Sequence, residues 1–341
     1  MPRGLRIGYP VPGDYALVAE QGDYILTGRD AILDHEEAGE TTFDEDFVAR
    51  RSAPGVVFYQ GFDTSAAITA KYQPGPNGNR VTHDTTTKVL SGGSMRFNLL
   101  AGEGGANLAG GWFTNWGTTF GEGDTFYVQY RVRLSETMLS NNTTYWRKTG
   151  GSSRPDHKIC IIYENGGLTC ADLEITVIGP GHFHSNVYTH CGNHSARSET
   201  TTPNHRDGTP YAWQMGWDLN SGPNWVDEPN AYEHREYPTG PDSFPVGEWF
   251  TIYMKVVIGD WGVPNSSIEM WIQREGENFW RKKVSVNEYT LDNDGTGSGF
   301  GANVFTPYMT QLATTAPVDA FMWISEFIVS SQPIAIPKAV L

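Results

Sequence analysis

The chain has 341 residues, with 39 acidic against 24 basic side chains and a net charge of −15. This charge argues against a nucleic-acid groove, because phosphate binding needs clustered Lys and Arg. Eleven Trp, 16 Tyr and 16 Phe, together with 39 Gly and 20 Pro, favour strands joined by tight turns over helices, and the length suffices for one large sandwich.

The first predicted element is a repeated phrase, in which Gly13-Asp14-Tyr15-Ala16-Leu17 recurs as Gly22-Asp23-Tyr24-Ile25-Leu26. Within each copy the Tyr and the Leu stand two apart, so in an extended chain they share one face. The pattern predicts a small β-ribbon over residues 1–33. A ribbon of this size is marginal alone in water, so we expect it to attach to something larger. The predicted anchoring residues are Tyr15, Leu17, Tyr24 and Leu26.

Residues 15–30 of this ribbon resemble a short segment that recurs in structural proteins of tailed bacteriophages. The resemblance implies an adaptor that joins the chain to other virion proteins of the capsid or tail. Residues 1–10 lack the apolar stretch of an export signal, so we expect synthesis in the host cytoplasm and a final place on the virion surface. No run of about 18 apolar residues occurs, and we expect no membrane insertion.

Residues 34–55 are acidic and poor in apolar side chains, which predicts a solvated linker. Residues 56–341 form the predicted main domain, in which strand-like runs alternate with turn clusters. Alternation is clean in the run 125–134, where Phe126, Val128, Tyr130, Val132 and Leu134 share one face. Seven or more such runs without helical crossovers predict an all-β antiparallel sandwich of two sheets. The other runs are 56–63, 94–100, 157–163, 172–178, 249–258, 267–274 and 320–329.

The segments 247–262, 267–276 and 323–330 resemble the late strands of concanavalin A-like jelly rolls, the fold of lectins, laminin-G-like modules, glucanases and several polysaccharide lyases. The segments 127–134 and 187–192 are similar to uncharacterised bacterial and phage proteins of this type. The resemblance covers residues 56–335 and implies a jelly-roll sandwich with a ligand on its concave face. It implies no single activity, because this fold serves binding and catalysis alike.

A lyase that acts on acidic polysaccharide needs a group to neutralise the uronate carboxylate, a base for the α-proton and an acid for the leaving oxygen. Lyases of the resembling fold use Arg, Gln, His and Tyr on the concave sheet. The candidate residues in this chain are Arg131, Arg133, Lys158, Tyr188, His190, Tyr308 and Gln311. The Gln-Ile-His motif of alginate lyases and the Glu-x-Asp-x-x-Glu motif of glucanases are absent, so the sequence supports no confident catalytic assignment.

A long polar segment over residues 211–237 is rich in Trp and Tyr. A Trp face with flanking hydrogen-bonding groups suits the apolar face of a sugar ring. Trp, Tyr and Arg are equally enriched at oligomer contacts, and we favour this second interpretation, with a homo-oligomer expected. The residues concerned are Trp213, Trp217, Trp225, Tyr232 and Tyr237.

Cys170 and Cys191 flank the predicted strand 172–178 and the turn after it, so one hairpin would bring them together. A disulfide there is one reading, which the related proteins support by carrying Cys at both places. Two reduced thiols are the other reading, because a cytoplasmic origin disfavours the bond.

Two groups of polar residues are candidate metal sites. Four His between residues 182 and 194 lack the paired spacing of zinc ligands, which favours solvated imidazoles over a zinc site. Asp292 and Asp294 stand at alternate positions, as in calcium loops, but the segment has no closing Glu. We expect a plain turn and no cofactor, with a structural calcium ion as the alternative.

Two functional hypotheses follow. The first is a phage virion surface protein, a capsid decoration, head fibre or tail-associated protein, whose jelly roll binds glycans such as cell-surface polysaccharide. Its support is the pairing of the N-terminal segment with the sandwich. The second is a polysaccharide lyase or hydrolase, and its support is the fold alone. Of the two, the virion protein is the expectation, without enzymatic activity, and a polysaccharide lyase is the alternative if the chain is an enzyme.

Overall fold

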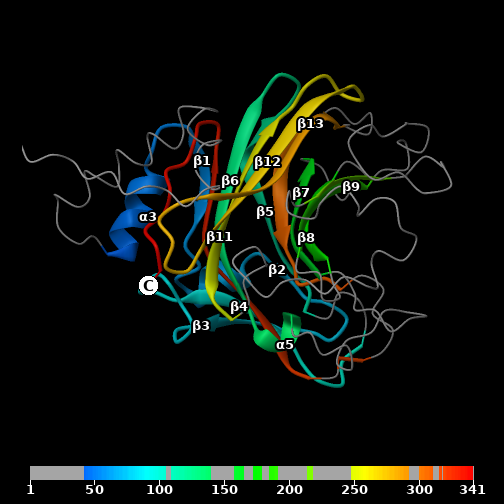
Figure 1. Cartoon of the computed structure of the whole chain (residues 1–341). Helices are drawn as coiled ribbons and strands as arrows, with labels where there is room; N and C mark the ends of the chain where they lie inside the picture. The colour runs from blue at the N-terminus through cyan, green and yellow to red at the C-terminus, as the bar shows by residue number, and fades with distance from the viewer. Residues whose placement is uncertain are drawn as a thin grey trace, which may run out of the picture.

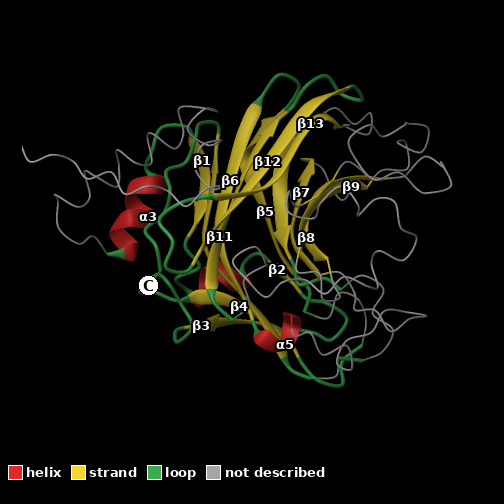
Figure 2. Cartoon of the chain, in the orientation of Figure 1, coloured by secondary structure: helices red, strands yellow, loops and turns green. Residues whose placement is uncertain are grey.

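The computed structural model describes residues 42–104, 109–139, 157–164, 172–178, 184–190, 213–217, 247–291, 299–309, 315–316 and 318–340. These residues form two antiparallel sheets packed face to face, with short helices at the periphery (Figures 1 and 2). The predicted fold class, an all-β jelly-roll sandwich, is therefore confirmed.

The first sheet, sheet A, has the strand order β13-β12-β11-β6-β15-β4-β3, and β1 pairs with the far end of β15. Its strands are β1 (Val56–Gln60), β3 (Val81–Asp84), β4 (Ser94–Leu99), β6 (Thr125–Leu134), β11 (Trp249–Val257), β12 (Pro264–Arg274), β13 (Arg281–Thr290) and β15 (Ala320–Ser330). Its centre is β6, which pairs in long register with β11 on one side and β15 on the other.

The second sheet, sheet B, has the strand order β10-β9-β8-β7-β14-β5-β2. Its strands are β2 (Tyr72–Gln73), β5 (Gly111–Phe120), β7 (His157–Glu164), β8 (Asp172–Ile178), β9 (His184–His190), β10 (Trp213–Trp217) and β14 (Phe300–Phe305). Sequence neighbours β7, β8, β9 and β10 pair in succession, whereas β14 inserts between β7 and β5, so the sheet joins segments that are far apart in the chain.

The core lies between the two sheets and follows the predicted alternation. In β6 the five apolar residues of the predicted face are all fully buried, and Ile268, Met270 and Ile272 of β12 face the same core. From sheet B, Trp112 and Phe305 pack against each other with ring centroids 6.1 Å apart. The removal of these side chains from water supplies the main driving force for stacking the sheets.

Three helices are present among the described residues: α3 (Phe43–Arg51), α4 (Ser65–Thr69) and α5 (Glu136–Leu139). A capping box starts α3, because Thr42 Oγ1 accepts a hydrogen bond from the Glu45 amide and the Glu45 carboxylate accepts one from the Thr42 amide. Phe47 and Arg50 of this helix are buried against sheet A. Part of the segment predicted as a solvated linker therefore packs on the sandwich, while the domain boundaries stay predictions.

Buried Asp84 at the end of β3 organises the loop that leads to β4. Its Oδ1 accepts hydrogen bonds from the amides of Thr86 and Thr87, and its Oδ2 accepts from Trp323 Nε1 and Arg96 Nη1. Burial opposes the charge, but these donors together hold the pKa of Asp84 well below its ordinary value of 3.8. The carboxylate form of Asp84 therefore stabilises the fold.

The Asp84→Asn variant should be less stable than the wild type by about 2 kcal/mol at neutral pH, because an amide offers one acceptor oxygen in place of two charged ones. A depressed pKa contributes stability above the unfolded value of 3.8, and this contribution is lost as the pH falls below it. The difference between the two proteins in urea unfolding should thus shrink in acid. The control is Asp63→Asn, at an exposed position. If the difference in unfolding free energy between the wild type and Asp84→Asn stays constant with pH, the stabilising role of the Asp84 carboxylate is contradicted.

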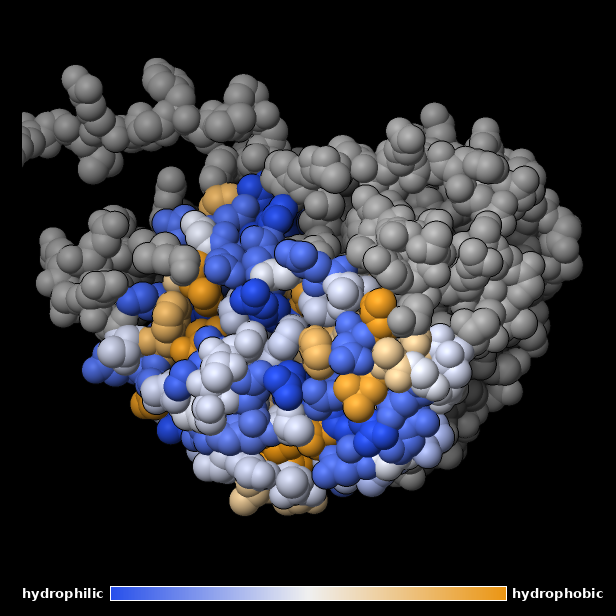
Figure 3. Space-filling model, turned by 90° about the horizontal axis from the view of Figure 1, so that it is seen from below, coloured by the Kyte–Doolittle hydropathy of each residue, from blue (hydrophilic) through white to orange (hydrophobic). Residues whose placement is uncertain are grey.

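On the face seen in Figure 3, hydrophobic residues form small separated spots among hydrophilic ones. Across all described residues, only Val48, Tyr59 and Val263 are large hydrophobic side chains with high exposure. None of the described helices has the length and hydropathy needed to span a bilayer.

Candidate functional site

The outer face of sheet A is closed by two segments from opposite ends of the described chain. Helix α3 and the C-terminal tail (331–340) both lie on this side of the sandwich (Figure 1). Under them, Phe47, Tyr253, Ile328 and Ile334 form a second, smaller hydrophobic cluster. Where α3 and the tail cover it, this face of sheet A is therefore part of the packed interior and is not exposed to solvent.

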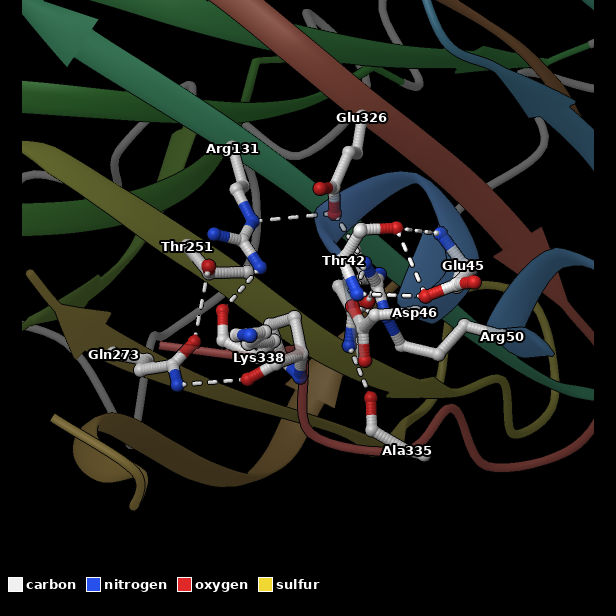
Figure 4. Close-up of polar contacts among 12 residues, drawn as sticks. Thr42, Glu45, Asp46, Arg50, Arg131, Thr251, Gln273, Glu326, Ala335 and Lys338 are labelled. Atoms are coloured by element: carbon white, nitrogen blue, oxygen red, sulfur yellow. Dashed lines mark hydrogen bonds and ion pairs between the residues drawn. The ribbon is translucent and has the colours of Figure 1, made fainter. Parts of the chain in front are cut away.

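A buried network of charged groups fastens α3 to the sheet (Figure 4). The Arg50 guanidinium donates to Asp46 Oδ2 at 2.7 Å, to Gln129 Oε1 at 2.6 Å and to the carboxylate of Glu326. Glu326 also accepts from Arg131 Nε at 3.2 Å. Burial lowers the pKa of Arg50, but the carboxylates of Glu326 and Asp46 raise it by more, so the guanidinium stays charged.

The same network holds the C-terminal tail through its backbone carbonyls. Gln129 Nε2 donates to the oxygen of Ala335 at 2.9 Å, and Arg131 Nη2 donates to the oxygen of Lys338. Two strands away, on β12, Gln273 Nε2 donates to the oxygen of Pro337 at 3.0 Å. The tail pairs with no described strand, so its backbone carbonyls need other hydrogen-bond donors. Polar side chains on the outer face of sheet A supply these donors in place of water.

Arg131 and Arg133 therefore lie on sheet A, whereas Lys158 lies on sheet B. Arg131 is 1% exposed and is enclosed by Glu326 and the tail, and Arg133 is half-buried on the same face of β6. Burial lowers the pKa of Arg131, and the attraction of Glu326 opposes this shift. In this structure Arg131 serves packing and charge balance, and it is not accessible to a polysaccharide.

Replacement of Arg50 by Met should destabilise the fold by about 3 kcal/mol. It leaves the carboxylate of Asp46 buried without its partner, and it leaves the buried Glu326 with one guanidinium, that of Arg131, in place of two. The matched control is Arg51→Met, whose guanidinium contacts only the rings of Phe47 and Tyr59 and should cost less than about 1 kcal/mol. Chemical denaturation measures both. Equal losses in the two variants would contradict the role of the network.

The outer face of sheet B carries the remaining candidates that the structure describes. Lys158 of β7 is half-buried, and its Nζ lies 5.0 Å from the centre of the Tyr308 ring. The backbone brings them together, because the Lys158 amide donates to the Tyr308 oxygen at 2.8 Å. An ammonium over an aromatic face is a favourable contact that also fixes the direction of the lysine.

The register of β7, β8 and β9 extends this face across the sheet. Val187 of β9 is buried in the core and pairs with Ile175 of β8. Tyr188 stands opposite Glu174, which stands opposite Ile161 of β7. His190 stands opposite Asp172. Lys158 lies on β7, and Tyr188 and His190 lie on β9, with β8 between these two strands.

The edge strand β10 carries two of the predicted glycan-stacking or interface residues. Trp213 pairs with His190 of β9, and Trp217 pairs with Asn186. Towards β5, sheet B carries a small apolar cluster of Ile161, Tyr163, Ala302, Phe113 and Val304. Ile161, Tyr163 and Ala302 of this cluster are buried, whereas Lys158 and Tyr308 are half-buried and keep some contact with solvent.

Several predicted residues lie outside the described residues, and their roles stay predictions. They are Tyr15, Leu17, Tyr24, Leu26, Cys170, Cys191, Trp225, Tyr232, Tyr237, Asp292, Asp294 and Gln311. The remaining cysteine, Cys160, is buried in the core as a free thiol, and its burial raises its pKa. Within the described ranges, no three His, Cys, Asp or Glu side chains lie close enough to hold a metal ion.

Comparisons with known proteins agree with the fold. No family model matches the chain, and no curated protein matches it. Among solved structures, endo-beta-1,4-glucuronan lyase from the fungus Trichoderma reesei is 10% identical with a TM-score of 0.50, covering 84% of this chain and all of that one.

Two further solved structures are similar at lower scores. The PL-14 alginate lyase from Aplysia kurodai is 12% identical with a TM-score of 0.46, covering 80% of this chain and 98% of that one. The binding domain of botulinum neurotoxin serotype C1 is 11% identical with a TM-score of 0.37, covering 76% and 45%. The likeness to the glucuronan lyase agrees with the fold class, a jelly-roll sandwich, and at 10% identity it shows the fold alone.

Proposed function

We propose that this chain binds polysaccharide on the outer face of sheet B, with Lys158 and Tyr308 at the centre of the site. The observation that carries the proposal is the contact between the Lys158 ammonium and the Tyr308 ring, in a sheet whose further strands carry Tyr188, His190 and Trp213. An ammonium pairs with a uronate carboxylate, and aromatic faces pack on the apolar side of a pyranose. The shared fold with a glucuronan lyase supports an acidic polymer as the ligand.

A polysaccharide lyase is the second candidate, and one specific feature of this face favours it. Lys158, Tyr188, His190 and Tyr308 are residue types that neutralise a carboxylate, abstract a proton and protonate a leaving oxygen. Arg131 is buried on the other sheet, so any neutralising cation in this mechanism would be Lys158. Binding requires only the contacts, whereas catalysis also requires that the acid and the base reach the same sugar.

The Lys158→Ala variant should bind glucuronan or alginate about tenfold more weakly than the wild type, because one charged hydrogen bond is lost. Affinity electrophoresis or calorimetry measures the change. Lys88→Ala is the matched control, since Lys88 is an exposed lysine in the loop before β4. Equal binding by the wild type and Lys158→Ala would contradict the site. A product that absorbs in the ultraviolet, formed by the wild type and not by Lys158→Ala, would establish the lyase reading.

We further propose that residues 1–41 attach the chain to a phage particle and that the sandwich is displayed on the virion surface as a homo-oligomer. The support is the resemblance of residues 15–30 to segments of tailed-phage structural proteins. The position of α3 adds to it: the chain enters the sandwich on the side of sheet A, so the candidate glycan face of sheet B points away from the attachment (Figure 1).

Deletion of residues 1–41 should leave a folded, glycan-binding sandwich that no longer joins the particle. Deletion of residues 1–51 should also destabilise the sandwich, because it removes Phe47 and Arg50 from the outer face of sheet A. Thermal unfolding and quantitative immunoblots of purified particles separate the two effects. Full incorporation of the shorter deletion would contradict the attachment role of residues 1–41.

A further inference from the structure

An exposed patch with the composition of a protein contact lies where the described chain begins. Val48 of α3 is 45% exposed and Tyr59 of β1 is 47% exposed, and these are two of the three exposed large hydrophobic side chains among the described residues. They belong to one surface, because the Arg51 guanidinium lies over the Tyr59 ring and Val48 stands three residues before Arg51 on the same side of the helix. We call Val48, Arg51 and Tyr59 the α3 patch.

Arg51 gives the α3 patch a positive charge. Its guanidinium lies 4.8 Å from the centre of the Tyr59 ring and 5.5 Å from that of Phe47. The ion pairs found among the described residues do not include Arg51, in contrast to its buried neighbour Arg50. Val48 and Arg51 are three residues apart on the helix and so are adjacent on its surface. An exposed Tyr and a stacked Arg beside an apolar side chain are typical of interface hot spots.

The α3 patch is also held in one conformation. The buried Arg50 contacts fix α3 on sheet A, and the pairing of Tyr59 with Ile328 fixes β1 beside β15. A surface that is ordered before binding loses little conformational entropy on association, which favours a specific contact.

We infer that the α3 patch is a second contact with the virion protein that receives residues 1–41, and that this protein presents a carboxylate next to an apolar surface. This inference rests on the proposed attachment. The 41 residues that precede Thr42 end at the first turn of α3, so a protein that holds them is tethered beside the patch. Arg51 has no acidic partner in the described part of the chain. Its positive charge therefore favours an acidic residue on that protein as its partner.

The test compares single variants of the full-length chain for incorporation into particles. Val48→Ser, Arg51→Glu and Tyr59→Ser should each lower incorporation about tenfold at limiting protein concentration. Val263→Ser is the matched control, since Val263 is 42% exposed in the turn between β11 and β12. Arg51→Gln serves as a second variant if Arg51→Glu unfolds, and circular dichroism melts establish that each variant is folded.

Three outcomes decide the inference. Loss of incorporation by the patch variants, with unchanged incorporation of Val263→Ser and unchanged self-association in analytical ultracentrifugation, supports it. Wild-type incorporation of all the patch variants overturns it, even if deletion of residues 1–41 abolishes incorporation and so upholds the proposed attachment. Loss of self-association along with incorporation also overturns it, because the occupant of the patch would then be a second copy of this chain.

Discussion

The ion pair between Arg50 and Glu326 is the interaction on which the arrangement of this molecule depends. It joins the first helix of the described chain to the last strand, 276 residues later, in a place that water does not reach. Two buried carboxylates face two buried guanidiniums, so the charges balance. A buried charge without its partner is strongly destabilising, so α3 and the tail are held in a single position.

The closure of sheet A assigns different roles to the two outer faces. The outer face of sheet A carries Arg131, Gln129 and Gln273, which are residue types suited to bind a polysaccharide. Their N–H groups, however, already donate hydrogen bonds to Glu326 and to carbonyls of the tail. On the outer face of sheet B, Lys158 is half-buried and its ammonium contacts an aromatic ring. Attachment on one side and ligand binding on the other is the division that we propose.

Several elements could have been found in the sequence and were missed, for identifiable reasons. Thr42-Phe-Asp-Glu45 is a capping box, and Arg50 and Arg51 suit the last turn of a helix, yet the acidic composition around them suggested a linker. Strand β5 contains Gly, Asn and Thr among its aromatic residues and so lacks clean alternation. Its strand conformation comes from pairing with β14, a partner almost 190 residues away.

The sequence by itself determined the two-sheet class and the inward face of β6, because a period of two is a local property that needs no partner. It also indicated both Arg131 and Lys158 as candidate site residues, with no basis for ranking one above the other. Only the tertiary structure separated them, since strand order places β6 in sheet A and β7 in sheet B, and α3 with the tail covers one of these faces. Strand order and coverage depend on contacts between distant segments, which no local pattern encodes.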